Sequence, residues 1–134
     1  MIIGFACGVF DLFHAGHVRM LKECKENCDH LIVALNKAEN LSKDKNTPIY
    51  TICERIEILE SCKYVDEILV YNSEEELYEL MRSKKIDVRF LGADYKSKPI
   101  TGADLHVKIY YTDRAHGLST SGYLKKIIER YGGR

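Results

Sequence analysis

Two histidines stand three residues apart near the start of the chain, in the stretch "GVFDLFHAGH" at residues 8–17. Residues at positions i and i+3 lie on one side of a helix, so His14 and His17 would present their imidazoles together. Gly16 lets the backbone begin a helix in a tight space. Because a helix N-terminus already attracts anions through its free N–H groups and its dipole, this stretch predicts an anion site with two imidazole donors.

A second candidate anion site occupies "RAHGLSTSGYLKK", residues 114–126. A guanidinium, backbone N–H groups and hydroxyl groups at the start of a helix can converge there on phosphate oxygens. The Ser-Thr-Ser run is equally suited to be an ordinary helix cap. The residues concerned are Arg114, Gly117, Ser119, Thr120 and Ser121.

Alternating strands and helices must position these two sites. Short runs rich in Ile, Val, Leu and Tyr predict strands buried on both faces, at 1–7, 30–36, 64–70, 87–92 and 107–111. Apolar residues at three- and four-residue spacing predict helices at 17–27, 51–62, 73–84 and 119–131, with N-caps at Ser73 and at Ser119 or Thr120. The segment 93–106 is expected to be a loop.

This alternation predicts an α/β fold, a single Rossmann-like doubly wound domain over residues 1–134 with a five-stranded parallel sheet. In such folds ligands bind beyond the carboxyl ends of the strands. We therefore expect the ligand at the ends of the first and fourth strands, near Gly8 and Gly92.

Composition narrows the classes of partner. The 134 residues are 46% hydrophobic and 30% charged, and 20 basic side chains balance 20 acidic ones. A neutral chain has no overall field that would draw it to nucleic acid or to a membrane surface, so we expect neither partner. No segment approaches the roughly 18 apolar residues of a membrane span, and the opening run lacks the basic start of a secretory signal. We expect a cytoplasmic location.

The cysteines support a reducing compartment. The five cysteines form an odd set without a C-x-x-C pair, which argues against a disulfide framework. Cys24 and Cys28 can share a helix face near His30, but a zinc site needs a fourth ligand that the sequence does not supply. We expect no metal site made by the protein alone.

The two histidine- and serine-containing stretches resemble the signatures of a known family. "GVFDLFHAGH" resembles the HxGH signature of the nucleotidyltransferases, and "RAHGLSTS" resembles the R-x-x-G-[IL]-S-T-[ST] element of their cytidylyltransferase branch. The resemblance covers nearly the whole chain and is closest to the glycerol-3-phosphate cytidylyltransferases of teichoic acid and capsule pathways. It implies a homodimer in which a phosphorylated alcohol, such as glycerol 3-phosphate, attacks the α-phosphate of CTP. Pyrophosphate would leave, with Mg²⁺ bound to the CTP, and the CDP-linked product would feed cell-surface polymer synthesis.

The resemblance also implies roles for particular residues. The implied catalytic residues are His14, His17, Arg114 and Lys45. Those implied for nucleotide binding are Gly8, Val9, Phe10, Asp11, Gly16, Gly92, Asp94, Gly117, Ser119, Thr120 and Ser121. Lys43 and His116 are implied for the acceptor. Lys43 and Lys45 can equally be ordinary surface lysines, and Asp94 can equally be a turn residue. Arg55 can either support the site through a carboxylate or only form part of a helix face.

Three departures from the family pattern keep alternatives open. Val9 stands where the family has threonine, Ala115 and His116 replace Thr-Glu, and the family's acceptor lysine on the third helix is missing. In addition, "HAGH" and "ADYKSKPITG" resemble the adenylyltransferases that act on heptose phosphates. The alternatives are therefore an adenylyltransferase that uses ATP and a sugar phosphate, and a nucleotide-binding module without catalysis.

Overall fold

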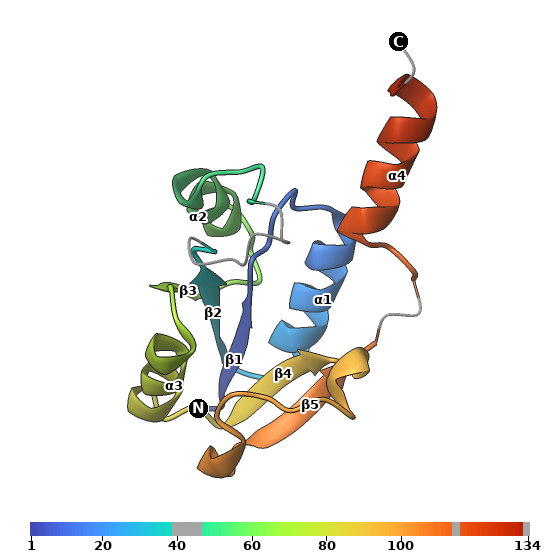
Figure 1. Cartoon of the computed structure of the whole chain (residues 1–134). Coiled ribbons are helices and arrows are strands. Elements are labelled where there is room, and N and C mark those ends of the chain that lie inside the picture. Colours follow the sequence, from blue (N-terminus) through green and yellow to red (C-terminus); the bar gives the residue numbers. More distant parts are fainter. Residues whose placement is uncertain (39–46, 114–115, 133–134) are drawn as a thin grey trace.

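Five parallel strands form the sheet that organises the protein (Figure 1). The structure, a computed structural model, describes residues 1–38, 47–113 and 116–132. The sheet order is β3-β2-β1-β4-β5, and every neighbouring pair is parallel. This is the doubly wound order, and its direction reverses between β1 and β4, as the alternation of elements predicts. The strands are β1 (Ile3–Gly8), β2 (His30–Asn36), β3 (Glu67–Tyr71), β4 (Val88–Gly92) and β5 (Lys108–Thr112).

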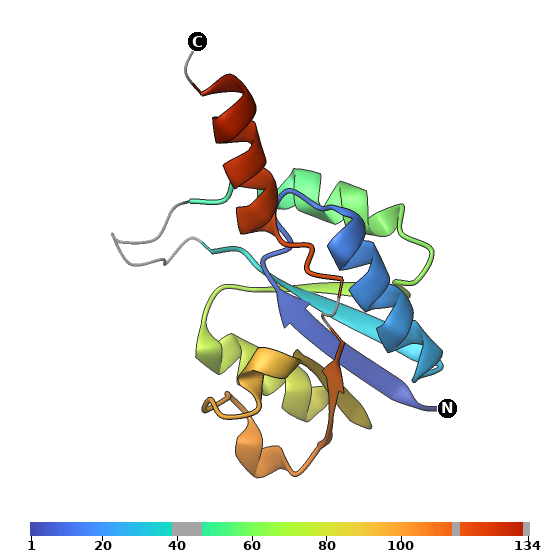
Figure 2. The same cartoon turned by 90° about the vertical axis from the view of Figure 1, so that its right-hand side faces the viewer.

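Helices cover both faces of the sheet, as Figure 2 shows. The covering helices are α1 (Ala15–Glu26) and α2 (Ile52–Glu60) on one face and α3 (Glu74–Ser83) on the other, whereas α4 (Thr120–Tyr131) lies outside these layers. Successive residues of a strand point to opposite faces, so Ala6 packs with Leu21 of α1 and Leu59 of α2, whereas Phe5 packs with Leu77 of α3. One core thus lies under α1 and α2, and the other under α3.

The helix caps correct one expected boundary and agree with two expected caps. The first helix begins at Ala15, two residues before the expected start, because His14 itself is the N-cap. Ser73 and Ser119 cap α3 and α4 through hydrogen bonds to backbone N–H groups, as their residue types predict. The segment expected as a loop contains two short 3-10 turns, Ala93–Tyr95 and Ala103–Leu105.

The last helix projects from the rest of the protein. No residue of α4 is buried, and its apolar side chains Leu124, Ile127, Ile128 and Tyr131 are exposed. Figures 1 and 2 both show α4 pointing away from the sheet, with its first turn beside the start of α1. Within the described residues, no helix has the length and apolar character needed to cross a membrane.

Candidate active site

The two histidines form the N-terminal cap of α1. Nδ1 of His14 accepts the backbone N–H of Gly16 at 3.0 Å, and the backbone N–H of His14 donates to Nδ1 of His17 at 3.1 Å. This is a capping box in which imidazoles take the places that a serine or threonine and a glutamate usually fill. The ring centroids are 4.0 Å apart. The cap therefore fixes both rings side by side at the helix start.

The cap also determines which ring nitrogen carries hydrogen. Because Nδ1 of each ring accepts a backbone N–H, the hydrogen of each neutral imidazole must be on Nε2. Nε2 of His14 lies 3.2 Å from Oγ1 of Thr120, the first residue of α4, and donates to it. Both histidines are thus held as Nε2–H donors, and Thr120 lies within hydrogen-bond distance of one of them.

The turn before the histidines has a strained backbone. Phe10 and Leu12 have positive φ angles of 52° and 49°, which side chains with a Cβ rarely adopt. The ring of His17 stacks on the ring of Phe13, with 5.2 Å between the ring centroids, and its centroid lies 5.6 Å from that of the Phe10 ring. Phe10 is buried in the core. Such strain persists only where the surroundings hold it, and it concentrates at functional sites.

Gly16 makes room for this arrangement. A Cβ atom at this position would lie 2.7 Å from Cε1 of His14 and 3.1 Å from the Cβ of Leu118. The first distance is too short for any real contact, so a side chain here would displace the His14 ring. Glycine at this position therefore allows the start of α1 to pack closely against His14 and the segment before α4.

A cavity of about 250 Å³ opens at this point, beyond the ends of β1 and β4. The starts of α1 and α4 form its other walls. It brings together eleven of the residues singled out from the sequence. They are Gly8, Val9, Phe10, His14, Gly16, His17, Gly92, Asp94, His116, Ser119 and Thr120.

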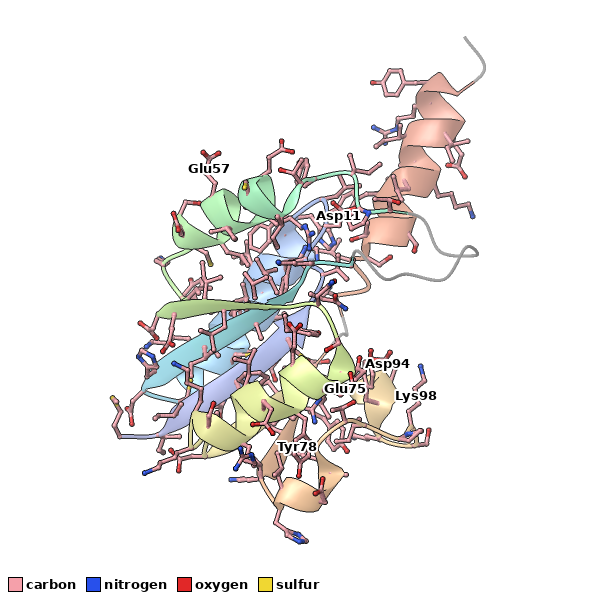
Figure 3. The ribbon with its side chains drawn as sticks, turned by 60° about the vertical axis from the view of Figure 1, so that its left-hand side comes forward. Asp11, Glu57, Glu75, Tyr78, Asp94 and Lys98 are labelled. Carbon is pink, nitrogen blue, oxygen red and sulfur yellow. The ribbon has the colours of Figure 1, made fainter. Side chains whose placement is uncertain are left out.

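Several other candidates lie elsewhere. The Asp11 carboxylate, labelled in Figure 3, accepts the backbone N–H groups of Ile49 at 2.8 Å and Tyr50 at 2.9 Å, which positions the entry to α2. Gly117 and Ser121 follow the second motif but do not line the cavity. Lys43, Lys45 and Arg114 lie outside the described residues.

Arg55 supports the site through carbonyl groups. It is only 2% exposed, and burial lowers its pKa while nearby Asp11 opposes that shift. Its guanidinium joins the backbone after β1 to the end of β2 and to the turn before α2. The acceptors are the carbonyl oxygens of Val9 at 3.0 Å, Asn36 at 2.6 Å, Lys37 at 3.0 Å and Tyr50 at 3.3 Å.

A second, larger cavity of about 750 Å³ lies beside the first, on the α3 side of the sheet. The two share seven lining residues, which are Cys7, Gly8, Val9, Met20, Gly92, Tyr95 and Thr112. The sequence analysis did not select its most unusual lining residue, Arg89 of β4, which is 5% exposed. A signal was present, because an arginine inside the run "VRFLG" is unexpected for a strand buried on both faces.

Three of the cysteines, Cys7, Cys24 and Cys28, are not activated for nucleophilic chemistry. Burial raises the pKa of Cys7, although the Arg89 guanidinium opposes this, and burial also raises the pKa of Cys24 and Cys28. Thiols with raised pKa values are poor nucleophiles at neutral pH. All five cysteines are free, and the described part of the chain contains no cluster of three or more His, Cys, Asp or Glu side chains able to hold a metal.

Comparison with known proteins adds a family match. The model of the cytidylyltransferase-like family matches residues 5–124. The bifunctional protein HldE of Wolinella succinogenes is 38% identical over 127 residues, which are 93% of this chain and 27% of that protein. HldE of Campylobacter jejuni subsp. doylei is 35% identical over 130 residues, which are 96% of this chain and 28% of that protein. The chain thus spans little more than a quarter of these relatives.

A solved structure has the same fold. The crystal structure of the lipopolysaccharide core biosynthesis protein from Thermoplasma volcanium GSS1 superposes with a TM-score of 0.69. It is 28% identical in sequence, and the match covers 84% of this chain and 99% of that one.

Proposed function

Because the chain belongs to the cytidylyltransferase-like family of nucleotidyltransferases, we propose that it transfers a nucleotidyl group from a nucleoside triphosphate to a sugar phosphate. An oxygen of the acceptor's phosphate attacks the α-phosphorus, the bond to the bridging oxygen of the β-phosphate breaks, and pyrophosphate leaves. The observation that carries this proposal is the histidine pair, held with both Nε2–H groups as donors beside the first turn of α4.

In this reaction the protein positions the reactants and stabilises the charge that grows on the phosphates, so no protein nucleophile is needed. His14 and His17 donate to triphosphate oxygens. The hydroxyl of Thr120 and the N–H groups at the start of α4 bind the remaining phosphate charge. Arg114 and Lys45 stay in the proposal as further phosphate ligands, and Lys43 and His116 as ligands of the acceptor.

Magnesium fits this site as a companion of the nucleotide. Mg²⁺ binds mainly through substrate phosphates, with one or two carboxylates at most. Asp94 and Asp113 line the cavity and suit that role, while no cluster among the described side chains would bind the ion alone. When bound, Mg²⁺ supplies charge neutralisation on the departing pyrophosphate.

The similar proteins favour ATP and a sugar phosphate over CTP and glycerol 3-phosphate. HldE proteins match nearly the whole chain, and the solved neighbour is named for lipopolysaccharide core biosynthesis. The stretch "ADYKSKPITG" resembles adenylyltransferases that act on heptose phosphates. We therefore place adenylyl transfer first, with a nucleotide-linked sugar for cell-surface polysaccharide as the product. Cytidylyl transfer, which "RAHGLSTS" favours, comes second.

Pyrophosphate release tests the proposal. ATP and CTP are each combined with a heptose 1-phosphate, a hexose 1-phosphate and glycerol 3-phosphate, in the presence of Mg²⁺. We expect turnover with ATP and a sugar 1-phosphate. Turnover confined to CTP and glycerol 3-phosphate would support the second candidate, and tight nucleotide binding without any turnover would identify a non-catalytic module.

We also propose a homodimer, which the family resemblance implies and which is the commonest assembly of soluble oligomers. Sedimentation equilibrium at micromolar concentration tests it. A mass of one chain would contradict it.

A further inference from the structure

The second cavity has a polar floor that the histidine site does not use. Arg89 on β4 and Glu74 at the start of α3 line it, together with Thr101 on the connection after β4. Nη1 of Arg89 donates to the carbonyl oxygen of Thr101, and the Thr101 hydroxyl donates to the Glu74 carboxylate. These three residues are called the arginine pocket below.

The connection after β4 is fixed against α3. Besides the contact of Thr101 with Glu74, the hydroxyl of Tyr78 donates to the Asp104 carboxylate at 2.8 Å. Figure 3 shows Tyr78 on α3 and Lys98 on this connection, on the same side of the sheet. Two side-chain hydrogen bonds therefore hold the connection after β4 against α3, so the wall of the arginine pocket does not depend on one long side chain alone.

Arg89 is buried with part of its hydrogen-bonding capacity unused. A guanidinium has five N–H donors, and burying it without acceptors is costly. Within the described residues, Nε of Arg89 is the one buried side-chain N or O atom without a hydrogen-bond partner. Because Arg89 lines the second cavity, a ligand oxygen bound there can supply the missing acceptor.

The charges of the arginine pocket suit hydroxyl groups better than a second phosphate. Arg89 offers an N–H donor and Glu74 offers acceptor oxygens, and their charges offset each other. A sugar hydroxyl can both donate and accept, whereas a phosphate dianion beside Glu74 would be repelled. The apolar walls at Leu77 and Leu91 suit the C–H faces of a sugar ring.

The position of the cavity matches the geometry of the reaction. The two cavities meet at the ends of β1 and β4, where both are lined by Gly8 and Gly92. An acceptor whose phosphate attacks the α-phosphate at this junction must extend its remaining atoms away from the histidines. The second cavity, about 750 Å³ against about 250 Å³ for the first, is the space available in that direction.

We propose that the second cavity holds the sugar ring of the acceptor, with Nε–H of Arg89 donating to a ring hydroxyl oxygen and the Glu74 carboxylate accepting from a ring hydroxyl. Arg89 and Glu74 then select hydroxylated acceptors. This inference rests on the proposed function, whose reaction supplies the acceptor.

Steady-state kinetics with the acceptor varied at saturating nucleotide test the assignment, with a hexose 1-phosphate and its deoxy analogues as probes. For Glu74→Gln and Arg89→Met we expect the acceptor KM to rise about 10- to 100-fold, the range for a lost charge-assisted hydrogen bond. Nucleotide Kd should stay within about twofold, because the arginine pocket does not line the histidine site. Against the deoxy analogue that lacks the bound hydroxyl, wild type and variant should have similar KM values.

Glu75→Gln is the matched control, because Glu75 is the next carboxylate on α3 and does not line the second cavity. Since Arg89 is buried, Arg89→Met can fail to fold. Because Glu74 is exposed, Glu74→Gln should fold, and this variant tests the assignment if Arg89→Met does not fold. The assignment would be overturned if Glu74→Gln had the acceptor KM of wild type and if each deoxy analogue changed KM by the same factor in both proteins.

Equilibrium binding separates this inference from the proposed function. Calorimetric titration of the hexose 1-phosphate into the protein saturated with a non-hydrolysable ATP analogue needs no turnover. Binding by wild type that Glu74→Gln weakens supports the arginine pocket even where pyrophosphate release fails. Turnover of the sugar phosphate with equal affinity in wild type and Glu74→Gln supports the proposed function and refutes the pocket.

Discussion

At the scale of single residues, His14 and His17 have a structural task in the cap of α1, beside the chemical one that we propose for them. Nδ1 of each ring completes the cap of α1, and this same contact leaves Nε2 as the donor. A serine and a glutamate would cap the helix equally well but would offer no Nε2–H donor. The proposed phosphate ligand, rather than the helix, would therefore account for imidazole at these positions.

A pair of substitutions at His17 separates the two tasks. His17→Gln keeps a side-chain acceptor for the backbone N–H of His14, whereas His17→Ala removes it. We expect both variants to lose about two to three orders of magnitude in kcat, as when one preorganised donor is removed. Only His17→Ala should also lose about 1 kcal/mol of unfolding free energy, because it alone loses the cap contact. Urea denaturation and pyrophosphate release measure the two effects, and a kcat within a few-fold of wild type in both variants would show that the histidines are structural.

Gly16→Ala tests the close approach at the start of α1. The added Cβ would lie 2.7 Å from Cε1 of His14, so the ring must move and its contact with Thr120 must lengthen. A misplaced catalytic group can cost about 100-fold in rate. We expect kcat/KM to fall by about this factor. Gly117→Ala is an unsuitable control because φ of Gly117 is 68°, but Ser121→Ala, at an exposed position near the same turn, should change little.

At the scale of elements, Arg55 holds the active-site ends of the strands together. Its four carbonyl acceptors come from segments that are distant in sequence: the residue after β1, the end of β2 and the turn before α2. Asp11 fixes the same turn from the other side. The floor of the site is therefore held by side chains that bind backbone.

Arg55→Met should destabilise the fold more than it changes the chemistry. The apolar side chain fills similar space but leaves buried carbonyl groups without donors, at a total cost of roughly 3 kcal/mol. For a chain of this size we expect Tm to fall by about 10 °C. Calorimetry measures the shift, and Glu57→Gln, an exposed position of α2 labelled in Figure 3, is the control. A Tm within about 2 °C of wild type would contradict this role.

An ion-pair cluster at the starts of β2 and β3 and the end of α3 gives a pH-dependent prediction. Hydrogen bonds from His30 at 3.0 Å and Lys84 at 2.9 Å lower the pKa of Glu67 below its ordinary value of 4.5. A lowered carboxylate pKa contributes stability above the unfolded value, and this is lost as pH falls through the folded value. Because Glu67 is 31% exposed, we expect Glu67→Gln to cost only about 0.5–1 kcal/mol at pH 7 and less at pH 3 than at pH 7. Urea denaturation at both pH values measures the difference, and a difference that grows toward pH 3 would contradict the assignment.

The elements could be predicted from local pattern, whereas parts of the site could not. Buried strands and capped helices follow from apolar spacing and from residues such as Ser73, whose contacts are local. The role of Asp11 depends on backbone N–H groups that are distant in sequence, which spacing does not encode. The start of α1 depends on local contacts of His14 and His17, but histidine is not one of the usual capping residues. The arginine pocket joins β4, α3 and the connection after β4, so only the folded arrangement places Arg89 beside Glu74 and Thr101.

At the scale of the whole molecule, the reversal of strand order between β1 and β4 places both cavities at one edge of the sheet. The helix α4 completes the first cavity from outside the sheet. Its contacts with α1 run through its first turn, where Thr120 bonds to His14 and the Tyr123 ring lies 4.9 Å from the His14 ring.

Hydrogen exchange should therefore differ along α4. With no buried residue, α4 should exchange its amide hydrogens faster than α1, whose Leu21 and Cys24 are fully buried. Addition of Mg²⁺ and ATP should slow exchange at Gly122 and Tyr123 while leaving Ile127 to Tyr131 unchanged. Mass spectrometry of the exchanged peptides measures both regions. Protection of the outer half that increases with protein concentration would instead indicate self-association, and unchanged exchange at the first turn under saturating nucleotide would contradict the site.

The projecting helix has a mechanical consequence. Twelve residues at about 1.5 Å each make α4 a rigid arm about 18 Å long, so a rotation of about 10° at its first turn moves its far end by about 3 Å. The pivot is the turn that contacts His14. A rotation of α4 on nucleotide binding would therefore be largest at Tyr131, and a ligand of the outer half of α4 that opposed the rotation would weaken nucleotide binding by the same coupling energy.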